Sequence, residues 1–158
     1  MKYTTLNSYL KKKFGCKVYK ISLDCGFTCP NRDGTLGYGA CSRHTIYEMT
    51  LTELVLSEIR AHAEALELDE AGVTEQIESG KERVKNKIKS GKYIAYFQAF
   101  TNTYADVNTL EKIFSEAINH PDIVALSVAT RPDCLEQEKV ELLSRLNKIK
   151  PIFVELGL

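Results

Sequence analysis

The chain has no excess of charge of either sign. Its 158 residues contain 21 lysines and arginines and 21 aspartates and glutamates, so the formal net charge is zero. A balanced chain produces no long-range field, which argues against a global attraction to nucleic acid or to an anionic membrane. Only local basic patches remain compatible with this composition.

Long apolar runs are also missing. The first five residues are not followed by the apolar core of a signal peptide, and no segment approaches the length that crosses a bilayer. We therefore expect a cytoplasmic protein without a membrane partner. Hydrophobic residues still make up 44% of the chain, which is enough for one packed core at this length.

A complete set of disulfides is excluded as well, because the five cysteines are an odd number. Three of them, Cys25, Cys29 and Cys41, lie in one glycine-rich loop. In a cytoplasmic protein such clustering favours metal binding over disulfides. We expect Cys16 and Cys134 to pack as small apolar side chains.

Apolar periodicity predicts parallel β/α repeats. Strands are expected over residues 18–23, 93–97, 123–128 and 152–156. Helices are expected over residues 7–14, 51–68, 73–89 and 135–146, together with one that Asp106 caps. The last three strands recur about every thirty residues with a helix between them, which is the βαβ unit with right-handed crossovers. The predicted fold class is therefore α/β.

The last predicted strand has no helix after it, so one flank of the sheet would be an exposed apolar edge. We expect a fold that is cut short after its fourth strand; a partner that covers the edge is the alternative. The chain then divides into a helical cap at residues 1–16 and a β/α domain at residues 17–158.

The loop after the first strand carries the candidate chemistry. Cys29 and Cys41 enclose eleven residues, and His44 follows Cys41 after two more. In parallel β/α folds, functional groups collect on the loops that leave the carboxyl ends of the strands. We therefore expect both cysteines at that end of the sheet, with His44 close to them.

The loop sequence DCGFTCPNRDGT at residues 24–35 closely resembles the opening motif of the bacterial YhcC-type radical-SAM proteins, in the Elongator/MiaB/NifB-like branch. Further matches are YFQAFTNTY at residues 96–104, TRPDCL at 130–135 and ELGL at 155–158. The resemblance covers residues 1–41 and about 73–158. It implies a radical-SAM-type partial TIM barrel.

The resemblance also implies a [4Fe-4S] cluster and S-adenosylmethionine, whose reductive cleavage gives a 5′-deoxyadenosyl radical. In that family three thiolates hold three irons and leave the fourth iron for S-adenosylmethionine. By position, Cys29 and Cys41 match the first two ligands, and His44 stands in place of the third cysteine. The implied partners are S-adenosylmethionine, a substrate that the sequence does not identify, and a reductase or flavodoxin-type electron donor.

Six residues are expected to bind S-adenosylmethionine if the resemblance holds. They are Gln98, Thr101, Asn102, Thr103, Arg131 and Glu155. We nevertheless expect the 158-residue chain by itself to cleave the cofactor slowly. A neutral imidazole makes a cluster less reducing than a third thiolate, and without later β/α units the radical would be open to water.

Two other classes of function stay open. Cys25, Cys29, Cys41 and His44 form a set that suits a closed Cys3His zinc site. RNA binding is suggested by basic residues on one predicted helix and by a second basic run, although Glu78 and Glu82 interrupt the first group. These basic residues are Lys81, Arg83, Lys85, Lys87 and Lys89 on the helix and Lys11, Lys12 and Lys13 in the run.

The two remaining histidines carry no predicted function. His62 and His120 have no partner at ligand spacing in the sequence, and we expect both on the surface.

Overall fold

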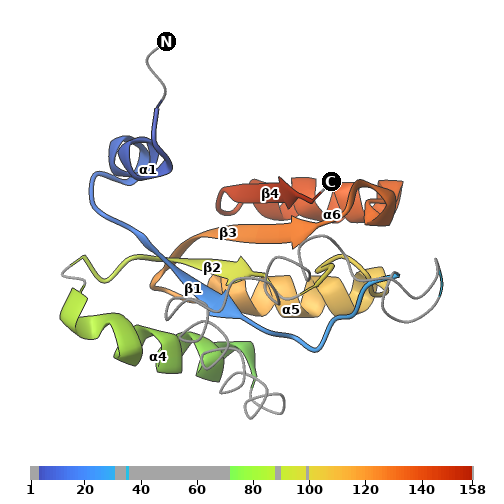
Figure 1. The fold of residues 1–158 in the computed structure, drawn as a ribbon, viewed down its shortest axis with the longest axis horizontal. Helices are drawn as coiled ribbons and strands as arrows, with labels where there is room; N and C mark the ends of the chain where they lie inside the picture. Colours follow the sequence, from blue (N-terminus) through green and yellow to red (C-terminus); the bar gives the residue numbers. More distant parts are fainter. Residues whose placement is uncertain (1–3, 31–34, 36–71, 88–89, 99, 158) are drawn as a thin grey trace, which may run out of the picture.

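The computed structural model describes residues 4–30, 35, 72–87, 90–98 and 100–157. Its centre is a four-stranded sheet in which the strands lie in chain order (Figure 1). The strands are β1 (Tyr19–Leu23), β2 (Tyr93–Phe97), β3 (Ile123–Thr130) and β4 (Ile152–Leu156). All three neighbouring pairs are parallel, so the predicted parallel α/β architecture is confirmed.

Four helices accompany the sheet in the described part of the chain. They are α1 (Leu6–Phe14), α4 (Val73–Val84), α5 (Val107–Asn119) and α6 (Gln137–Asn147). Short 3-10 helices follow α4 at Lys85–Lys87 and precede α6 at Pro132–Cys134. The helix expected over residues 51–68 lies outside the described residues.

Local signals explain where the helices start and stop. The Asp106 carboxylate accepts a hydrogen bond from the Thr109 backbone N–H at 3.0 Å, which is the predicted N-cap of α5. Gly15 ends α1 with a φ of 73°, a left-handed conformation that glycine adopts without strain. The predicted start of α6 was two residues too early, because Glu136 has an extended backbone and occupies the N-cap position, so that the helix begins at Gln137.

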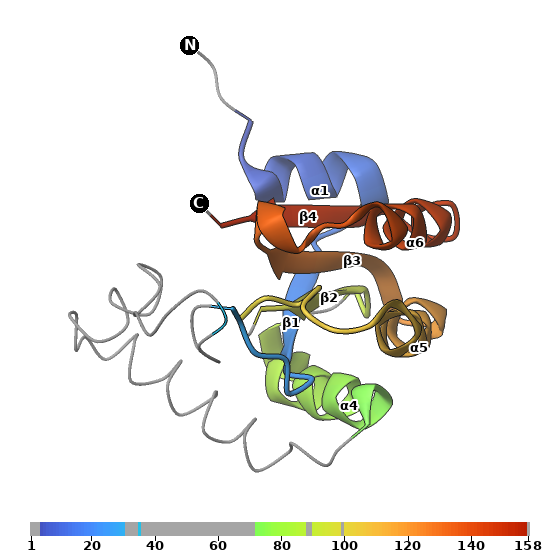
Figure 2. The same ribbon diagram turned by 90° about the vertical axis from the view of Figure 1, so that its right-hand side faces the viewer.

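The main hydrophobic core lies between the sheet and the layer of α4, α5 and α6 (Figure 2). Phe97 of β2 and Phe114 of α5 meet there edge to face, with ring centroids 4.9 Å apart. A smaller cluster forms on the opposite face, where Leu10 of α1 packs with Ile94 and Ala125. Both faces of the sheet are therefore covered near the amino ends of the strands, as parallel sheets require.

The predicted roles of two cysteines are confirmed. Cys16 packs against the smaller cluster, and Cys134 is buried in the short helix before α6. No helix in the described residues is long and apolar enough to cross a membrane.

The predicted apolar edge is present at β4. No described strand pairs with its outer side, and Val154 and Leu156 are 42% and 54% exposed. The edge therefore offers both unpaired backbone groups and apolar side chains to a further strand or to a partner.

Gly80 allows the close approach of α4 to β1. A Cβ atom at this position would overlap the Cγ2 atom of Ile21, a β-branched side chain whose position on the strand is fixed. We expect Gly80→Ala to lower the free energy of unfolding by about 1–3 kcal/mol, although alanine is the better helix former. Urea denaturation measures this change.

Gly72→Ala is the matched control, since a Cβ there meets only the Glu116 carboxylate at an ordinary 3.6 Å. Combining Gly80→Ala with Ile21→Ala should cost less than the sum of the two single changes, because the second substitution removes the overlapping methyl group. Additive costs would show that the close approach does not limit the packing.

Candidate functional site

The carboxyl ends of the first three strands meet through backbone hydrogen bonds. The Thr101 N–H donates to the Thr28 carbonyl at 3.2 Å, which joins the segment after β2 to the cysteine loop. The Asn102 N–H donates to the Ala129 carbonyl at 3.1 Å, which joins the same segment to β3. Cys29, next to Thr28, lies after the carboxyl end of β1, as the sequence predicts, and it is buried there.

A second contact to the cysteine loop comes from its far side. The hydroxyl groups of Thr35 and Tyr104 lie 3.2 Å apart. Cys41 and His44 lie outside the described residues, so the predicted approach of these two side chains to Cys29 stays a prediction. The described part of the loop is thus held against residues 101–104 at two points.

Thr103 fixes the loop after β3. Its hydroxyl donates to the Cys134 carbonyl at 2.6 Å and lies 2.5 Å from the Thr130 hydroxyl. A hydroxyl has one proton, so Thr130 is the donor in the second contact. Both threonines are buried. Thr103 is therefore part of the framework of the site, with its polar atoms already engaged.

Asn102 presents a buried acceptor. Its Nδ2 donates to the Ala129 carbonyl at 2.9 Å, which fixes the orientation of the amide group. The Oδ1 atom is buried and has no hydrogen-bond partner in the described structure, and the residue is fully buried. Buried acceptors without donors are uncommon in folded proteins. This oxygen suits a ligand that brings an N–H or O–H group.

Gln76 of α4 holds the start of the cysteine loop. Its Oε1 accepts from the Asp24 N–H at 2.9 Å, and its Nε2 donates to the Asp24 carbonyl at 2.7 Å. Asp24 in turn accepts a hydrogen bond from the Gly26 N–H at 3.0 Å, while its other carboxylate oxygen is buried and has no partner among the described residues. Sequence reasoning missed Gln76, although a polar residue between Val73 and Ile77 on the buried helical stripe was a usable signal.

Arg131 is engaged by a near neighbour. Its guanidinium group donates to both Asp133 carboxylate oxygens, at 2.9 and 2.7 Å. This pairing with Asp133 raises the pKa of Arg131. Burial raises the pKa of the Cys134 thiol, which therefore stays protonated and unreactive at neutral pH.

Glu155 lies on the sheet face opposite the layer of α4, α5 and α6, within a polar network that spans all four strands. Its carboxylate accepts hydrogen bonds from Lys20 of β1, from Ser127 of β3 and, at 3.1 Å, from the Tyr96 hydroxyl. The Lys20 ammonium also lies 4.0 Å from the centroid of the Tyr96 ring. Burial alone would raise the pKa of Glu155, but the three donors outweigh burial and lower it.

The six residues predicted to bind S-adenosylmethionine thus divide into two groups. Thr101, Asn102, Thr103 and Arg131 lie at the carboxyl-end junction. Gln98 and Glu155 lie on or beside the polar sheet face, where Ser22 donates to the Gln98 side chain at 3.4 Å.

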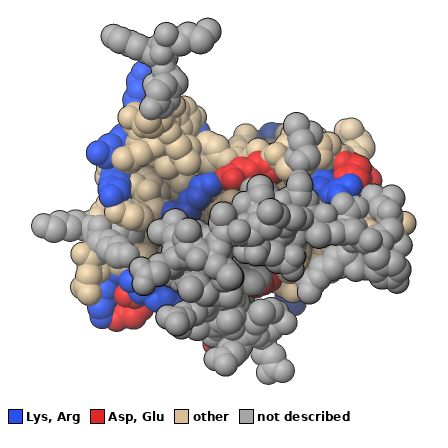
Figure 3. Space-filling view, in the orientation of Figure 1, with Lys and Arg blue, Asp and Glu red and all other residues tan. Residues whose placement is uncertain are grey.

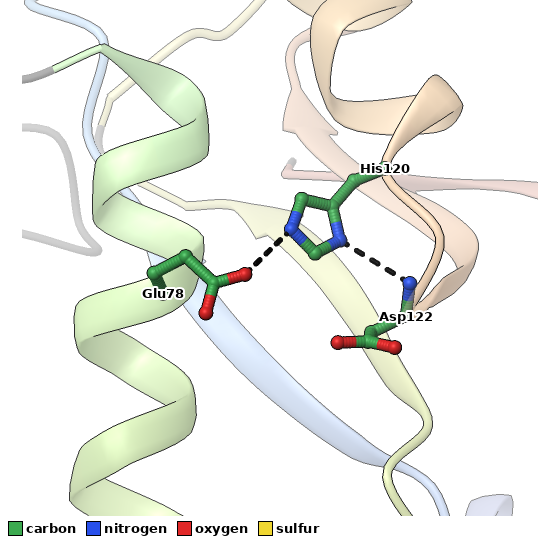
Figure 4. A group of neighbouring side chains, drawn as sticks. All are labelled: Glu78, His120 and Asp122. Atoms are coloured by element: carbon green, nitrogen blue, oxygen red, sulfur yellow. Dashed lines mark hydrogen bonds and ion pairs between the residues drawn. The ribbon is translucent and has the colours of Figure 1, made fainter.

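A third group of polar residues lies away from this junction, between α4 and the turn before β3 (Figure 4). Ligand atoms of Glu78, His120 and Asp122 all lie within 4.8 Å of one another, which is close enough for one metal ion. The prediction that His120 is a partnerless surface residue was wrong. It is only 8% exposed, and its Nε2 lies 2.9 Å from Glu78. His62 lies outside the described residues.

The group already contains a cation. The Lys81 ammonium lies 2.7 Å from Glu78 and 2.5 Å from Asp122. Its hydrogen bonds with Asp122 and Glu78 raise the pKa of Lys81, and those from Lys81 and His120 lower the pKa of Glu78. The His120 Nδ1 accepts from the Asp122 N–H at 3.2 Å, so Nε2 carries the ring proton and donates to Glu78. A metal ion would have to displace both the lysine and this proton.

Three known proteins are similar to the chain along nearly its whole length. YtqA of Bacillus subtilis (strain 168) is 44% identical over 157 residues, which are 99% of this chain and 45% of YtqA. YhcC of Escherichia coli (strain K12) is 34% identical over 150 residues, 94% of this chain and 43% of YhcC. MJ0486 of Methanocaldococcus jannaschii is 31% identical over 154 residues, 94% of this chain and 42% of MJ0486.

The predicted relationship to YhcC-type proteins is therefore supported. The chain spans less than half the length of the curated relatives it matches, and none of their names states an activity. No family model and no solved structure matches the chain.

The lowered pKa of Glu155 predicts a pH dependence. Its interactions contribute stability above the ordinary glutamate pKa of 4.5, and this contribution is lost as the pH falls through the lower folded pKa. The difference in unfolding free energy between the wild type and Glu155→Gln should be largest near neutral pH and should shrink toward about pH 3. Urea denaturation across this range measures it.

Glu138→Gln removes the same charge from an exposed position on α6 and controls for net charge. A Glu155→Gln difference that stays constant with pH would show that the folded carboxylate gains nothing from its three donors.

Proposed function

We propose that the chain is part of a radical-SAM protein. In this proposal Cys29, Cys41 and His44 hold a [4Fe-4S] cluster, and S-adenosylmethionine binds beside it at the carboxyl-end junction. The observation that carries the proposal is the buried, unpartnered Asn102 Oδ1, in a segment hydrogen-bonded to the cysteine loop. The cluster would supply the electron that splits the sulfonium of S-adenosylmethionine into methionine and a 5′-deoxyadenosyl radical.

The position of Cys29 supports the cluster. A cluster needs thiolates on a loop that is held in place and shielded from water. Cys29 is buried after the end of β1, and hydrogen bonds with Gln76 and Thr101 hold the preceding residues Asp24 and Thr28 in place. The proposed ligands are two cysteines and His44, where the family has three cysteines. The neutral imidazole of His44 would make the cluster less reducing.

The polar groups at the junction support S-adenosylmethionine. Its methionine ammonium group needs acceptors, and Asn102 Oδ1 is a buried acceptor that receives no hydrogen bond from the described residues. Its ribose hydroxyl groups also need acceptors, and Glu155 offers an ionised carboxylate on the sheet face. Thr103 would act by positioning, since its hydroxyl is engaged with Cys134 and Thr130.

The sheet supports the finer fold assignment, a radical-SAM-type partial TIM barrel. The four parallel strands follow one another in chain order, as neighbouring strands of such a barrel do. The outer side of β4 is unpaired by any described strand, and a barrel of this type has further parallel strands beyond its fourth.

Iron content tests the cluster. After anaerobic reconstitution, the His44→Cys variant should bind close to four irons and four sulfides per chain. The wild type should bind less iron and sulfide and should release them faster. Cys29→Ser should abolish binding, whereas Cys134→Ser, at a buried cysteine with a packing role, should leave it unchanged. Iron and sulfide assays with electron paramagnetic resonance provide the readout.

The zinc alternative gives a different result. If the purified chain is colourless and binds one zinc ion, and if Cys25→Ser loses that ion, the loop holds a Cys3His zinc site and no iron–sulfur cluster. Formation of 5′-deoxyadenosine over many turnovers by the unmodified chain would contradict the expected effect of His44.

Binding of S-adenosylmethionine tests Asn102. In the reconstituted His44→Cys background, Asn102→Leu should weaken binding about tenfold or more, because it removes the acceptor and leaves the ligand ammonium without a partner. Equilibrium dialysis measures the affinity. Asn108→Leu, at an exposed position of α5, is the control. Equal affinities for the two variants would remove Asn102 from the binding site.

A further inference from the structure

The amino-terminal part of the chain concentrates positive charge. The first 23 residues contain six lysines and no aspartate or glutamate, although the whole chain is neutral. Lys11, Lys12 and Lys13 are exposed on α1, and Lys17 is exposed just after it. In Figure 3 the blue side chains over α1 have no red ones among them.

Several other lysines are held in ion pairs, and, among the described residues, those of α1 are not. Lys81 is paired with Glu78 and Asp122, Lys85 with Glu82, and Lys139 with Glu136. Lys11, Lys12, Lys13 and Lys17 form no ion pair within the described residues. Of the two predicted basic groups, the one on and after α4 thus has two lysines, Lys81 and Lys85, held in ion pairs, whereas the run on α1 has none so held in the described structure.

Aromatic rings lie among these lysines. The Lys13 ammonium is 5.7 Å from the centroid of the Tyr9 ring and 5.3 Å from that of Phe153. The Tyr9 ring stands edge-on to Phe153, with centroids 6.3 Å apart, and the residue is 42% exposed. We call Tyr9, Lys11, Lys12, Lys13 and Lys17 the α1 patch. It combines unpaired cations with an exposed ring that neighbouring side chains hold in place.

We infer that the α1 patch binds single-stranded RNA, with its lysines on the phosphates and a base stacked on Tyr9. Lysines that lack carboxylate partners are free to neutralise phosphates, and an aromatic ring offers a stacking surface to any base. An acidic protein would use the lysines but would not need the ring.

A membrane surface fits the patch less well. An interfacial helix buries a continuous apolar face in the lipid. The apolar face of α1 is already used, since Leu10 is buried against Val18, Ile94 and Ala125. Leu6 and Tyr9 are the large apolar side chains that α1 exposes in the described structure.

The α1 patch is separate from the carboxyl-end junction. The residues beneath α1 lie near the amino ends of the strands, whereas Cys29 and Asn102 lie beyond their carboxyl ends. The patch would therefore dock RNA without taking part in chemistry, and this inference does not depend on the proposed function.

The test is fluorescence anisotropy with a labelled, mixed-sequence single-stranded RNA of about 20 nucleotides, measured from 50 to 200 mM salt. The triple variant Lys11→Gln, Lys12→Gln, Lys13→Gln should raise the Kd tenfold or more at 100 mM salt. It should also reduce the slope of log Kd against log salt by about two, as expected for three lost phosphate contacts. The matched control is Lys85→Gln, Lys112→Gln, Lys148→Gln, which should change the Kd less than twofold.

Tyr9→Ala separates stacking from charge. It should raise the Kd about fivefold or more and leave the salt slope unchanged. Circular dichroism should show the same melting for the triple variants and the wild type, since the substituted side chains are exposed.

Four results would overturn the inference. The first is that the wild type does not bind the RNA, and the second is that the two triple variants lose the same RNA affinity. The third is that Tyr9→Ala leaves the Kd unchanged. The fourth is that the wild type binds phosphatidylserine vesicles or a polyglutamate peptide more tightly than RNA. The last result would assign the patch to a membrane or to an acidic protein.

Discussion

The parallel pairing of β1, β2 and β3 is the constraint on which the candidate site depends. Parallel strands all point the same way, so the segments that leave them emerge at one end of the sheet. Here two backbone hydrogen bonds, from Thr101 to Thr28 and from Asn102 to Ala129, tie those segments together. Residues that are far apart in the chain thereby become neighbours of Cys29.

The framework around this junction leaves few polar atoms free. Gln76 satisfies both backbone groups of Asp24, and Thr103 satisfies the Cys134 carbonyl. One side-chain oxygen each of Asn102 and Asp24 has no partner in the part of the chain that the structure describes, and a buried acceptor without a donor costs stability. A ligand that supplies donors at the junction would recover that cost.

Charge is arranged unevenly over the molecule. Lys20 and Glu155 pair across the sheet face, and Lys81 closes the cluster of Glu78 and Asp122 between α4 and the turn before β3. These pairs join elements that are distant in the sequence and leave little net charge around them. The lysines of α1 form no ion pair with any described residue, so a chain that is neutral as a whole presents a basic surface there.

The sequence by itself determined the local structure. Apolar periodicity located all four strands, Asp106 and Gly15 marked helix ends, and the loop after the first strand placed Cys29 at the carboxyl end. These features depend on residues within a few positions of one another, so they can be read along the chain.

The tertiary structure decided which side chains form hydrogen bonds and ion pairs with each other. His120 meets Glu78 across 42 positions because α4 packs beside the turn before β3. Glu155 meets Lys20 across 135 positions, and Lys81 is neutralised by Asp122 across 41. Which lysines stay unpaired, and which buried oxygen lacks a donor, depends on how strands and helices pack together, and no local pattern in the sequence contains that information.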